Sequence, residues 1–273
     1  MVRKKDLLML AAAAAFSLGL ATAALAAEPS NFSVAADELE YDIQSGEGEA
    51  RGNVVLTDSL GKATGDYARF NSKKKNGLLR GNVVADREDA HIRCEEFIAH
   101  NENDMTAQGG AVLTKDGKSL HADRVDYFKE RGYAETVGSW AKLTDDADGS
   151  VLNASKIDYD MNSGLAHAYD GVTFESPSRK MSGSADNAVY DSKAGGTVEL
   201  IGNAHAVQDG NSIKGNKLRL TNSSVASADG GVKIIYIPEQ KPAQENAAAE
   251  DGQKAELAAE PADEAEVKPQ ELA

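Results

Sequence analysis

Apolar and polar residues alternate in short segments along most of the chain, from about residue 30 to residue 237. In one segment Leu39 and Tyr41 alternate with Glu38 and Glu40, so the two sets point to opposite sides of an extended backbone. A period of two predicts a β-strand with one buried face and one solvated face, which is typical of antiparallel sheets. No helical stripe is evident outside the first 26 residues, so we expect an all-β fold.

The alternating segments belong to a repeat that two independent motifs mark. The first motif is a small residue, a polar and mostly acidic residue, and then two apolar residues separated by single positions. It begins at Ala36, Gly65, Cys94, Ala122, Ala154, Ala185 and Gly215. The second motif is a glycine step, and it begins at Gly52, Gly81, Gly109, Gly138, Asp170, Gly202 and Gly230. Both motifs advance by 28 to 32 residues. They predict seven repeats of roughly 30 residues and about fourteen strands.

The predicted architecture is a repeat-built, antiparallel, twisted β-jelly roll that is open at its ends. We interpret the glycine steps as bends or bulges in each second strand. Alternation parity predicts which side chains point inward, and a register error of one residue would reverse a strand's set. The inward residues expected from the first strands are Leu39, Tyr41, Phe70, Phe97, Val125, Tyr127, Ile157, Tyr159, Leu218 and Leu220; those from the second strands are Val54, Val83, Ala111, Trp140, Val172 and Val232.

The first 26 residues have the composition of an export signal. Arg3, Lys4 and Lys5 form a basic start, residues 7–20 are apolar, and small residues precede a cleavage position after Ala26. We therefore expect an exported protein. The alternative is that the segment stays attached as a membrane anchor, because its apolar run approaches the roughly 20 residues that a span needs.

The last 36 residues differ in composition from the repeats. Residues 238–273 hold four of the six prolines, ten acids against three lysines, and few large apolar side chains. This composition predicts a disordered acidic tail, with a functional acidic arm as the alternative. The expected organisation is a signal peptide at 1–26, a repeat domain at 30–237 and a tail at 238–273.

Charge and cysteine content restrict the function classes. The formal net charge is −15, and no basic cluster of the kind that nucleic acids require is evident. Cys94 is the single cysteine, so no internal disulfide can form. It occupies the small-residue position of the third repeat. We expect a structural, half-buried side chain there, with a reactive thiol as the alternative.

Candidate catalytic or metal-binding chemistry is sparse. The acids Asp37, Asp66, Glu95, Asp123 and Asp186 recur in one column and would suit a row of calcium or sugar ligands. Each one also stands at a strand entrance, where a short polar side chain bonds to neighbouring backbone, and we prefer this structural interpretation. The histidines lack metal-ligand spacing and no nucleophile motif appears. We expect no enzyme, no cofactor and no metal, although clustered carboxylates would allow a sugar-cleaving alternative.

The interior and the ends of such a fold are its remaining features. An interior that does not close along one side becomes an apolar groove for acyl chains, whereas a closed interior is an ordinary packed core. The alternation of apolar and polar residues does not decide between the groove and the packed core. Unpaired edge strands at the two ends would allow one molecule to pair with the next, head to tail.

The repeated motifs resemble the LptA/OstA-like family of periplasmic lipopolysaccharide-transport proteins. The matching segments are Ala36 to Tyr41 with Gly52 to Val55, Gly65 to Phe70 with Gly81 to Val84, Ala122 to Tyr127, and Gly202 to Ala204. The resemblance covers roughly residues 33–237, and the acidic tail departs from it. It implies an incompletely closed β-jelly roll that binds the acyl chains of lipid A inside. It also implies head-to-tail stacking between an LptC-like inner-membrane partner and an LptD-like outer-membrane partner, in outer-membrane biogenesis.

The combined expectation is a non-enzymatic periplasmic lipid carrier. The expected lipid-binding residues are Leu39, Tyr41, Val54, Phe70, Val83, Phe97, Val125, Tyr127, Trp140, Ile157, Tyr159 and Val172. The alternative is a membrane-anchored LptC-like component or a structural interaction module of the envelope.

Overall fold

A computed structural model of the chain describes residues 32–58, 61–87, 90–191, 193, 197–221 and 226–236. The chain separates into two compact units, Met1–Ile237 and Pro238–Ala273, and all described residues belong to the first. The expected signal peptide, its cleavage position and the acidic tail lie outside the described residues.

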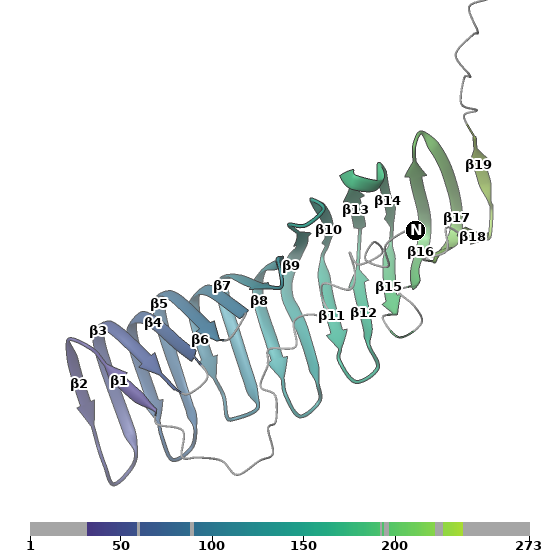
Figure 1. The fold of residues 1–273 in the computed structure, drawn as a ribbon. Coiled ribbons are helices and arrows are strands. Elements are labelled where there is room, and N and C mark those ends of the chain that lie inside the picture. Colours follow the sequence, from purple (N-terminus) through teal and green to yellow (C-terminus); the bar gives the residue numbers. More distant parts are fainter. Residues whose placement is uncertain are drawn as a thin grey trace, which may run out of the picture. The chain divides into compact units, whose positions relative to one another are not determined.

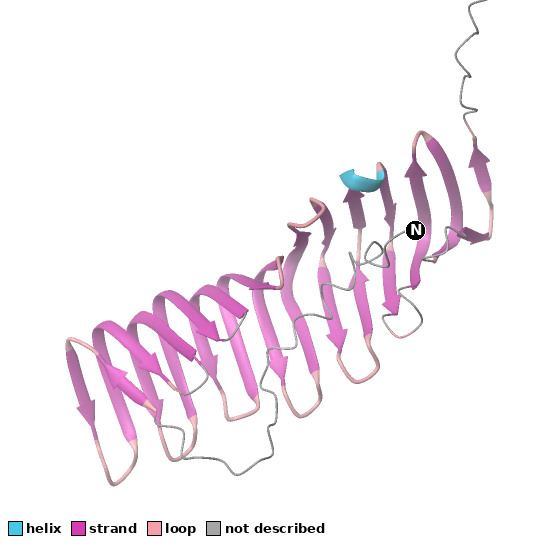
Figure 2. Cartoon of the chain, in the orientation of Figure 1, coloured by secondary structure: helices cyan, strands magenta, loops and turns pink. Residues whose placement is uncertain are grey.

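The described residues are almost entirely β-structure (Figures 1 and 2). In chain order the strands are β1 (Ser33–Ala35), β2 (Glu38–Tyr41), β3 (Glu47–Thr57), β4 (Gly61–Asn71), β5 (Asn76–Arg87), β6 (Ala90–Ala99), β7 (Asp104–Lys115), β8 (Lys118–Phe128), β9 (Tyr133–Asp145), β10 (Ser150–Ala154), β11 (Lys156–Asp160), β12 (Leu165–Tyr169), β13 (Val172–Ser176), β14 (Met181–Ala185), β15 (Asn187–Asp191), β16 (Thr197–Gln208), β17 (Asn211–Leu220), β18 (Ala226–Asp229) and β19 (Lys233–Ile235). A single 3₁₀ turn, η1 (Pro177–Arg179), interrupts them within the described part. No helix among these residues is long and apolar enough to cross a membrane.

The 19 strands correspond to the fourteen that the repeat predicts. Nine strands, β3 to β9 with β16 and β17, are 10 to 13 residues long. The other ten are 3 to 5 residues long and form five pairs, each replacing one long strand that is interrupted in the middle. The interruptions fall at the two motifs of the repeat. The described strands pair antiparallel, and β3 to β9 follow one another in chain order.

The two sequence motifs are the two sides of one bend. Between β3 and β4 the register shifts, so that Gly52 and Asn53 lie opposite Asp66 alone. Both residues have positive φ, +73° at Gly52 and +48° at Asn53. A Cβ at Gly52 would lie 2.3 Å from Oδ2 of Asp37, on the preceding strand. Asn53 Nδ2 donates to that same carboxylate at 2.9 Å. This position therefore requires glycine in the first repeat, and the predicted bulge is confirmed.

The column of acids has a structural explanation at these bends. Asn82 Nδ2 donates to Asp66 at 3.1 Å, and Asn203 Nδ2 donates to Asp186 at 3.0 Å. At the fourth repeat the Trp140 indole N–H donates to Asp123 at 2.8 Å. No group of three or more histidine, cysteine or acidic side chains suited to a metal ion is present in the described ranges. The acids thus satisfy donors of the bend on the facing strand.

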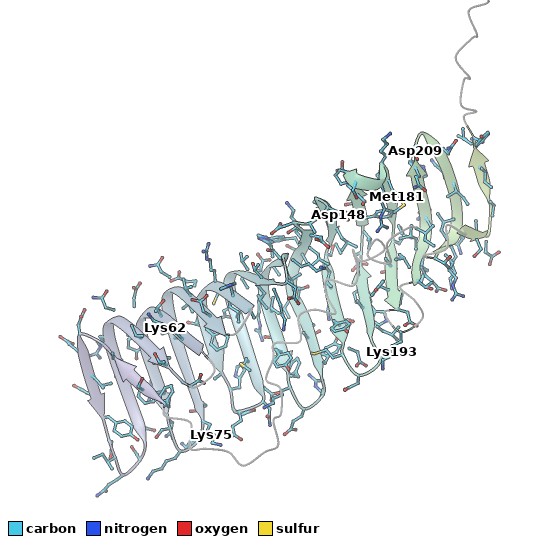
Figure 3. All side chains as sticks on the ribbon, viewed as in Figure 1. Lys62, Lys75, Asp148, Met181, Lys193 and Asp209 are labelled. Atoms are coloured by element: carbon cyan, nitrogen blue, oxygen red, sulfur yellow. The ribbon has the colours of Figure 1, made fainter. Side chains whose placement is uncertain are left out.

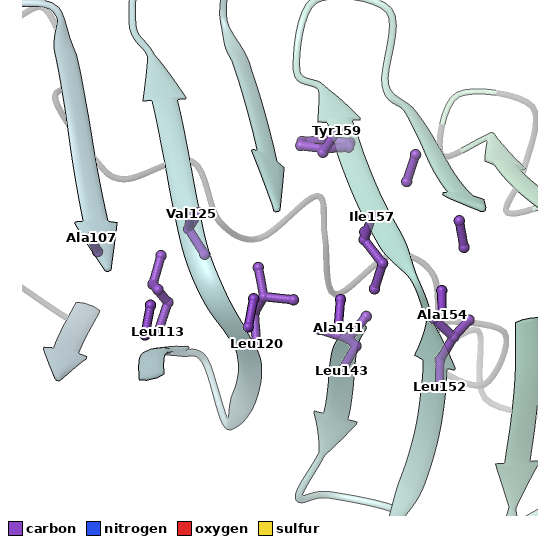
Figure 4. Close-up of a cluster of buried hydrophobic side chains, with 14 of the residues drawn as sticks. Ala107, Leu113, Leu120, Val125, Ala141, Leu143, Leu152, Ala154, Ile157 and Tyr159 are labelled. Carbon is purple, nitrogen blue, oxygen red and sulfur yellow. The ribbon is translucent and has the colours of Figure 1, made fainter. Parts of the chain in front are cut away.

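Each bend divides the long strands into two halves whose inner faces contribute to one core. Leu113, Leu120, Leu143 and Leu152 come from the halves near one row of turns. Ala107, Val125, Ile157 and others come from the halves beyond the bend (Figure 4). All belong to a single cluster of buried apolar side chains. The fold is therefore two sheet layers joined along the line of bends.

Trp140 was predicted to point inward, and this prediction is wrong. Ala122 pairs with Ala141 and Arg124 pairs with Val137, so three residues lie opposite Asp123 instead of the two found at Gly52 and Asn53. The extra residue places Ala141 in the buried position and leaves Trp140 on the outer surface, 44% exposed.

The expected burial also fails at the two ends. Leu39 and Tyr41 lie on the inner face, directly opposite Ala50 and Gly48, but they are 49% and 47% exposed. Val232 is 48% exposed near the other end. Within the described residues the end strands have a neighbour on one side only, so fewer side chains cover them.

Candidate functional site

The middle of the interior is a packed core. Val125 and Ile157 are 4% and 3% exposed, and Leu143 and Leu152 are more deeply buried still. Among the twelve expected lipid-binding residues, the buried ones are Val54, Val83, Val125, Tyr127, Ile157, Tyr159 and Val172. In the middle of the array, therefore, side chains fill the space between the two layers.

Near the N-terminal end of the array the layers border a half-open apolar cavity of about 290 Å³. Its lining comes from strands β3 to β7 and from Phe32, which precedes β1. The lining residues are Phe32, Leu56, Thr57, Asp58, Gly61, Lys62, Ala63, Ala85, Asp86, Ala90, Ile92, Phe97, Ala99 and Met105. Apolar side chains thus meet here from both halves of the strands without filling the space.

The lining of the cavity includes one residue of the expected lipid-binding set and several residues outside that set. Phe97 lines it and is partly buried. Leu56, Ala85 and Ile92 line it from the other half, each two residues along the strand from a buried side chain, and Met105 lines it beside Ala99. The sequence would have predicted Leu56, Ala85 and Ile92 if the period-two alternation had been extended from each motif to the end of its strand.

An aromatic cluster lies near the same end. The rings of Phe32 and Phe70 meet edge to face with centroids 5.8 Å apart, and Tyr41 stacks on Phe70 at 6.1 Å. The Tyr41 hydroxyl lies 2.9 Å from Oγ of Ser72 in the turn between β4 and β5. Phe70 is partly buried in this cluster, so exposed Tyr41 and Phe32 form its outer surface.

Burial favours the neutral forms of three ionisable side chains of the interior. Burial raises the pKa of the Cys94 thiol to about 11, and burial also raises the pKa values of Tyr127 and Tyr190. A thiol with this pKa is protonated at neutral pH and is a poor nucleophile. Cys94 is therefore a small core residue, as the structural interpretation of the sequence expects.

A polar network on the outer face of β8 and β11 includes two buried carboxylates. Asp158 accepts hydrogen bonds from the Tyr169 hydroxyl at 2.8 Å and lies 2.8 Å from Nδ1 of His167. Burial, together with the bond to Asp158, raises the pKa of Tyr169 to about 12. The other carboxylate, Asp126, binds Arg124 through two bonds of 2.8 Å. Every one of these groups has a protein partner, which is typical of a structural network.

The geometry suits the binding of an apolar group in the cavity between the layers. The family model of the LptA/(LptD N-terminal domain) LPS transport proteins matches residues 62–224. Among solved structures, the chain is similar to the crystal structure of LptH, the LptA homologous periplasmic component of the lipopolysaccharide transport device of Pseudomonas aeruginosa. The identity is 15%, the match covers 76% of this chain and 95% of that chain, and the TM-score is 0.15. No curated protein matches the chain.

Proposed function

Because the chain belongs to the LptA/(LptD N-terminal domain) family of lipopolysaccharide-transport proteins, we propose that it is a periplasmic carrier that holds lipopolysaccharide acyl chains between its two sheet layers. The observation that carries this proposal is the apolar cavity of about 290 Å³ between the two halves of β3 to β7. Each acyl methylene that leaves water for such a site contributes about 0.8 kcal/mol. The proposal contains no catalytic step and no cofactor.

The size of the cavity constrains how a whole lipid would bind. A volume of about 290 Å³ lies just below the range for small-molecule sites, which is about 300–1,000 Å³. Lipid A carries several acyl chains, so the layers must separate further along the array to admit all of them. The residues that would then line the groove are the buried ones of the expected set, such as Val125 and Tyr127.

The ends of the array support the proposed bridging role. In the described part, β1 and β2 pair only with β3, and β18 and β19 pair only with β17. Each end therefore presents unpaired backbone N–H and C=O groups. We propose that these edges pair head to tail with further copies and with LptC-like and LptD-like partners, so that lipid moves from the inner to the outer membrane along adjoining interiors.

A site-specific photo-crosslinker tests the carrier proposal in cells. At Phe97, which lines the cavity, we expect a crosslink to lipopolysaccharide. At Lys142, an exposed residue of β9, we expect none. A crosslinker at Met105 provides a second position on the cavity wall. Absence of lipopolysaccharide crosslinks at both Phe97 and Met105, in protein that is folded and exported, would refute the carrier role.

A further inference from the structure

Three consecutive lysines form the turn between β4 and β5. Lys73, Lys74 and Lys75 are all exposed, in a chain whose net charge is −15 (Figure 3 labels Lys75 at this edge of the array). Such a turn is unusual in so acidic a protein. The turn also lines hollows that lead toward the apolar cavity.

The lysine turn is connected to the cavity through shared lining residues. Ala99 lines both the apolar cavity and a neighbouring hollow of about 420 Å³, which Phe70 and Leu78 also line. Lys74 lines that second hollow and also a third one of about 380 Å³, together with Lys73 and Lys75. Apolar and cationic surfaces therefore succeed one another from the cavity to the turn.

The charges in these hollows leave one ammonium group available. Lys73 donates to the backbone oxygen of Gln44, and Lys75 forms an ion pair with Glu102. Lys74 has no ion pair with any residue in the described ranges.

Three carboxylates line the third hollow together with the three lysines, and each of them has a donor of its own. Glu102 has Lys75, Asp104 accepts from Asn101 at 3.0 Å, and Glu130 accepts from Asn103 at 2.6 Å. The second hollow adds Glu47 as a further acid and Arg69 and His100 as further basic groups.

We propose that the Lys73–Lys75 turn binds a phosphate group of the same glycolipid whose acyl chain enters the cavity, an inference that rests on the proposed function. Lysine ammonium groups bind phosphate as compact point charges. A lipid with phosphates next to its acyl chains matches a surface on which lysines adjoin an apolar opening. Lys74 makes the direct contact, and Lys73 and Lys75 turn from their present partners toward the phosphate. The site orients the lipid with its headgroup outside this edge of the array.

The test compares two lipids and three proteins. The lipids are bisphosphorylated lipid A and the same lipid after removal of both phosphates, each in the same detergent micelles. The proteins are the wild type, the triple variant K73Q/K74Q/K75Q, and the control triple variant K142Q/K180Q/K214Q. The control removes the same charge from exposed lysines of other strands and turns, and Lys180 in it also has an ion-pair partner, Asp209.

We expect the turn variant to bind bisphosphorylated lipid A about tenfold more weakly, which corresponds to about 1.4 kcal/mol. Its binding of the phosphate-free lipid should equal that of the wild type, and the control variant should bind both lipids normally. Replacing the three lysines by arginine should restore binding of the phosphorylated lipid. Thermal unfolding of each variant, followed by Trp140 fluorescence, checks that the fold is retained.

The outcomes separate this site from the proposed function. Unchanged binding of bisphosphorylated lipid A by the turn variant, or an equal loss in the control variant or with the phosphate-free lipid, overturns the phosphate site alone. Wild-type protein that binds neither lipid overturns the carrier proposal and the site with it.

Discussion

At the scale of single residues, the most demanding positions are the glycines of the bends. Gly81 has φ of +83°, and an added Cβ would lie 2.4 Å from Oδ2 of Asp66. Gly110 has φ of +74°, but a Cβ there would meet no atom within 4 Å. Alanine substitutions at the two positions therefore separate the cost of backbone strain from the cost of a collision between side chains.

The variant Gly81→Ala should be markedly less stable than Gly110→Ala. Left-handed backbone costs a non-glycine residue about 1–2 kcal/mol, and overpacking at Gly81 adds about 1–3 kcal/mol. Urea denaturation followed by circular dichroism measures the free energy of unfolding of both variants. Equal losses would show that Asp66 yields without cost and that only the backbone matters.

The buried thiol of Cys94 predicts a pH dependence in the alkaline range. Its pKa is raised to about 11 from the ordinary value of 9.0, so the folded state binds the proton more tightly than the unfolded state. Its contribution to stability is complete below pH 9 and is lost as the pH rises to about 11. A difference of two pKa units corresponds to about 2.7 kcal/mol at most.

We expect the free energy of unfolding of the wild type to fall more steeply between pH 9 and 11 than that of Cys94→Ala. The variant shares the tyrosines that also titrate at high pH, so the difference between the two slopes isolates the thiol. Parallel pH profiles would mean that the thiolate is tolerated in the folded protein.

At the scale of elements, the strands differ in how many neighbours hold them. Strands β7 and β8 pair on both sides along nearly their whole length. Among the strands that the structure describes, β19 pairs with β17 alone, and Ile234 and Ile235 in it are 66% and 47% exposed. Because local opening is easiest where few contacts are buried, the two ends should open first.

Amide hydrogen exchange followed by mass spectrometry tests this order. Peptides from β7 and β8 should exchange slowest, by at least about tenfold relative to β2 and β19, a ratio of about 1.4 kcal/mol in opening free energy. Uniform exchange across the array would indicate that it unfolds as one cooperative unit.

The elements also show what the sequence could predict and where it failed. Both motifs depend on local geometry, because each glycine–asparagine pair at positive φ lies against an acid of the preceding strand or strand pair. The repeat therefore predicted the bends and the fourteen strands. Trp140 was misplaced because the fourth bend has three residues where Gly52 and Asn53 are two, and motif spacing does not reveal that insertion.

Exposure at the ends and the position of the cavity depend on relations between distant strands. Parity placed Leu39 and Tyr41 on the correct face, but their exposure depends on β2 pairing with β3 alone among the described strands. Likewise, whether Ile92 packs tightly or lines an opening depends on how far apart the two layers lie at that end. Alternation along one strand carries no information on that separation.

At the scale of the whole molecule, the proposed head-to-tail contacts predict an effect of end residues on assembly. Ile234 is 66% exposed at the β19 end, whereas Val137 is 40% exposed at the bend of β9. The variant Ile234→Lys should weaken self-association by about tenfold, or about 1.4 kcal/mol, because it places a charge in an apolar contact. Val137→Lys makes the same change on the outer surface away from both ends and should have no effect.

Analytical ultracentrifugation over a range of protein concentrations measures both variants. Equal weakening by Ile234→Lys and Val137→Lys would point to a general charge effect. Unchanged association of Ile234→Lys would place the contact between copies elsewhere than at the β19 end.

The bends have one more consequence, which concerns how such a molecule can change size during evolution. Every repeat contains its own bend. Duplicating or deleting about thirty residues therefore adds or removes one complete pair of strands and leaves the cross-section of the fold unaltered. Since neighbouring strands are about 4.8 Å apart, one repeat of two strands changes the length of the array by about 9.6 Å. The length of the array can thus evolve independently of the residues that line its interior. A lineage whose envelope widens can lengthen the protein and keep the same surface for its cargo.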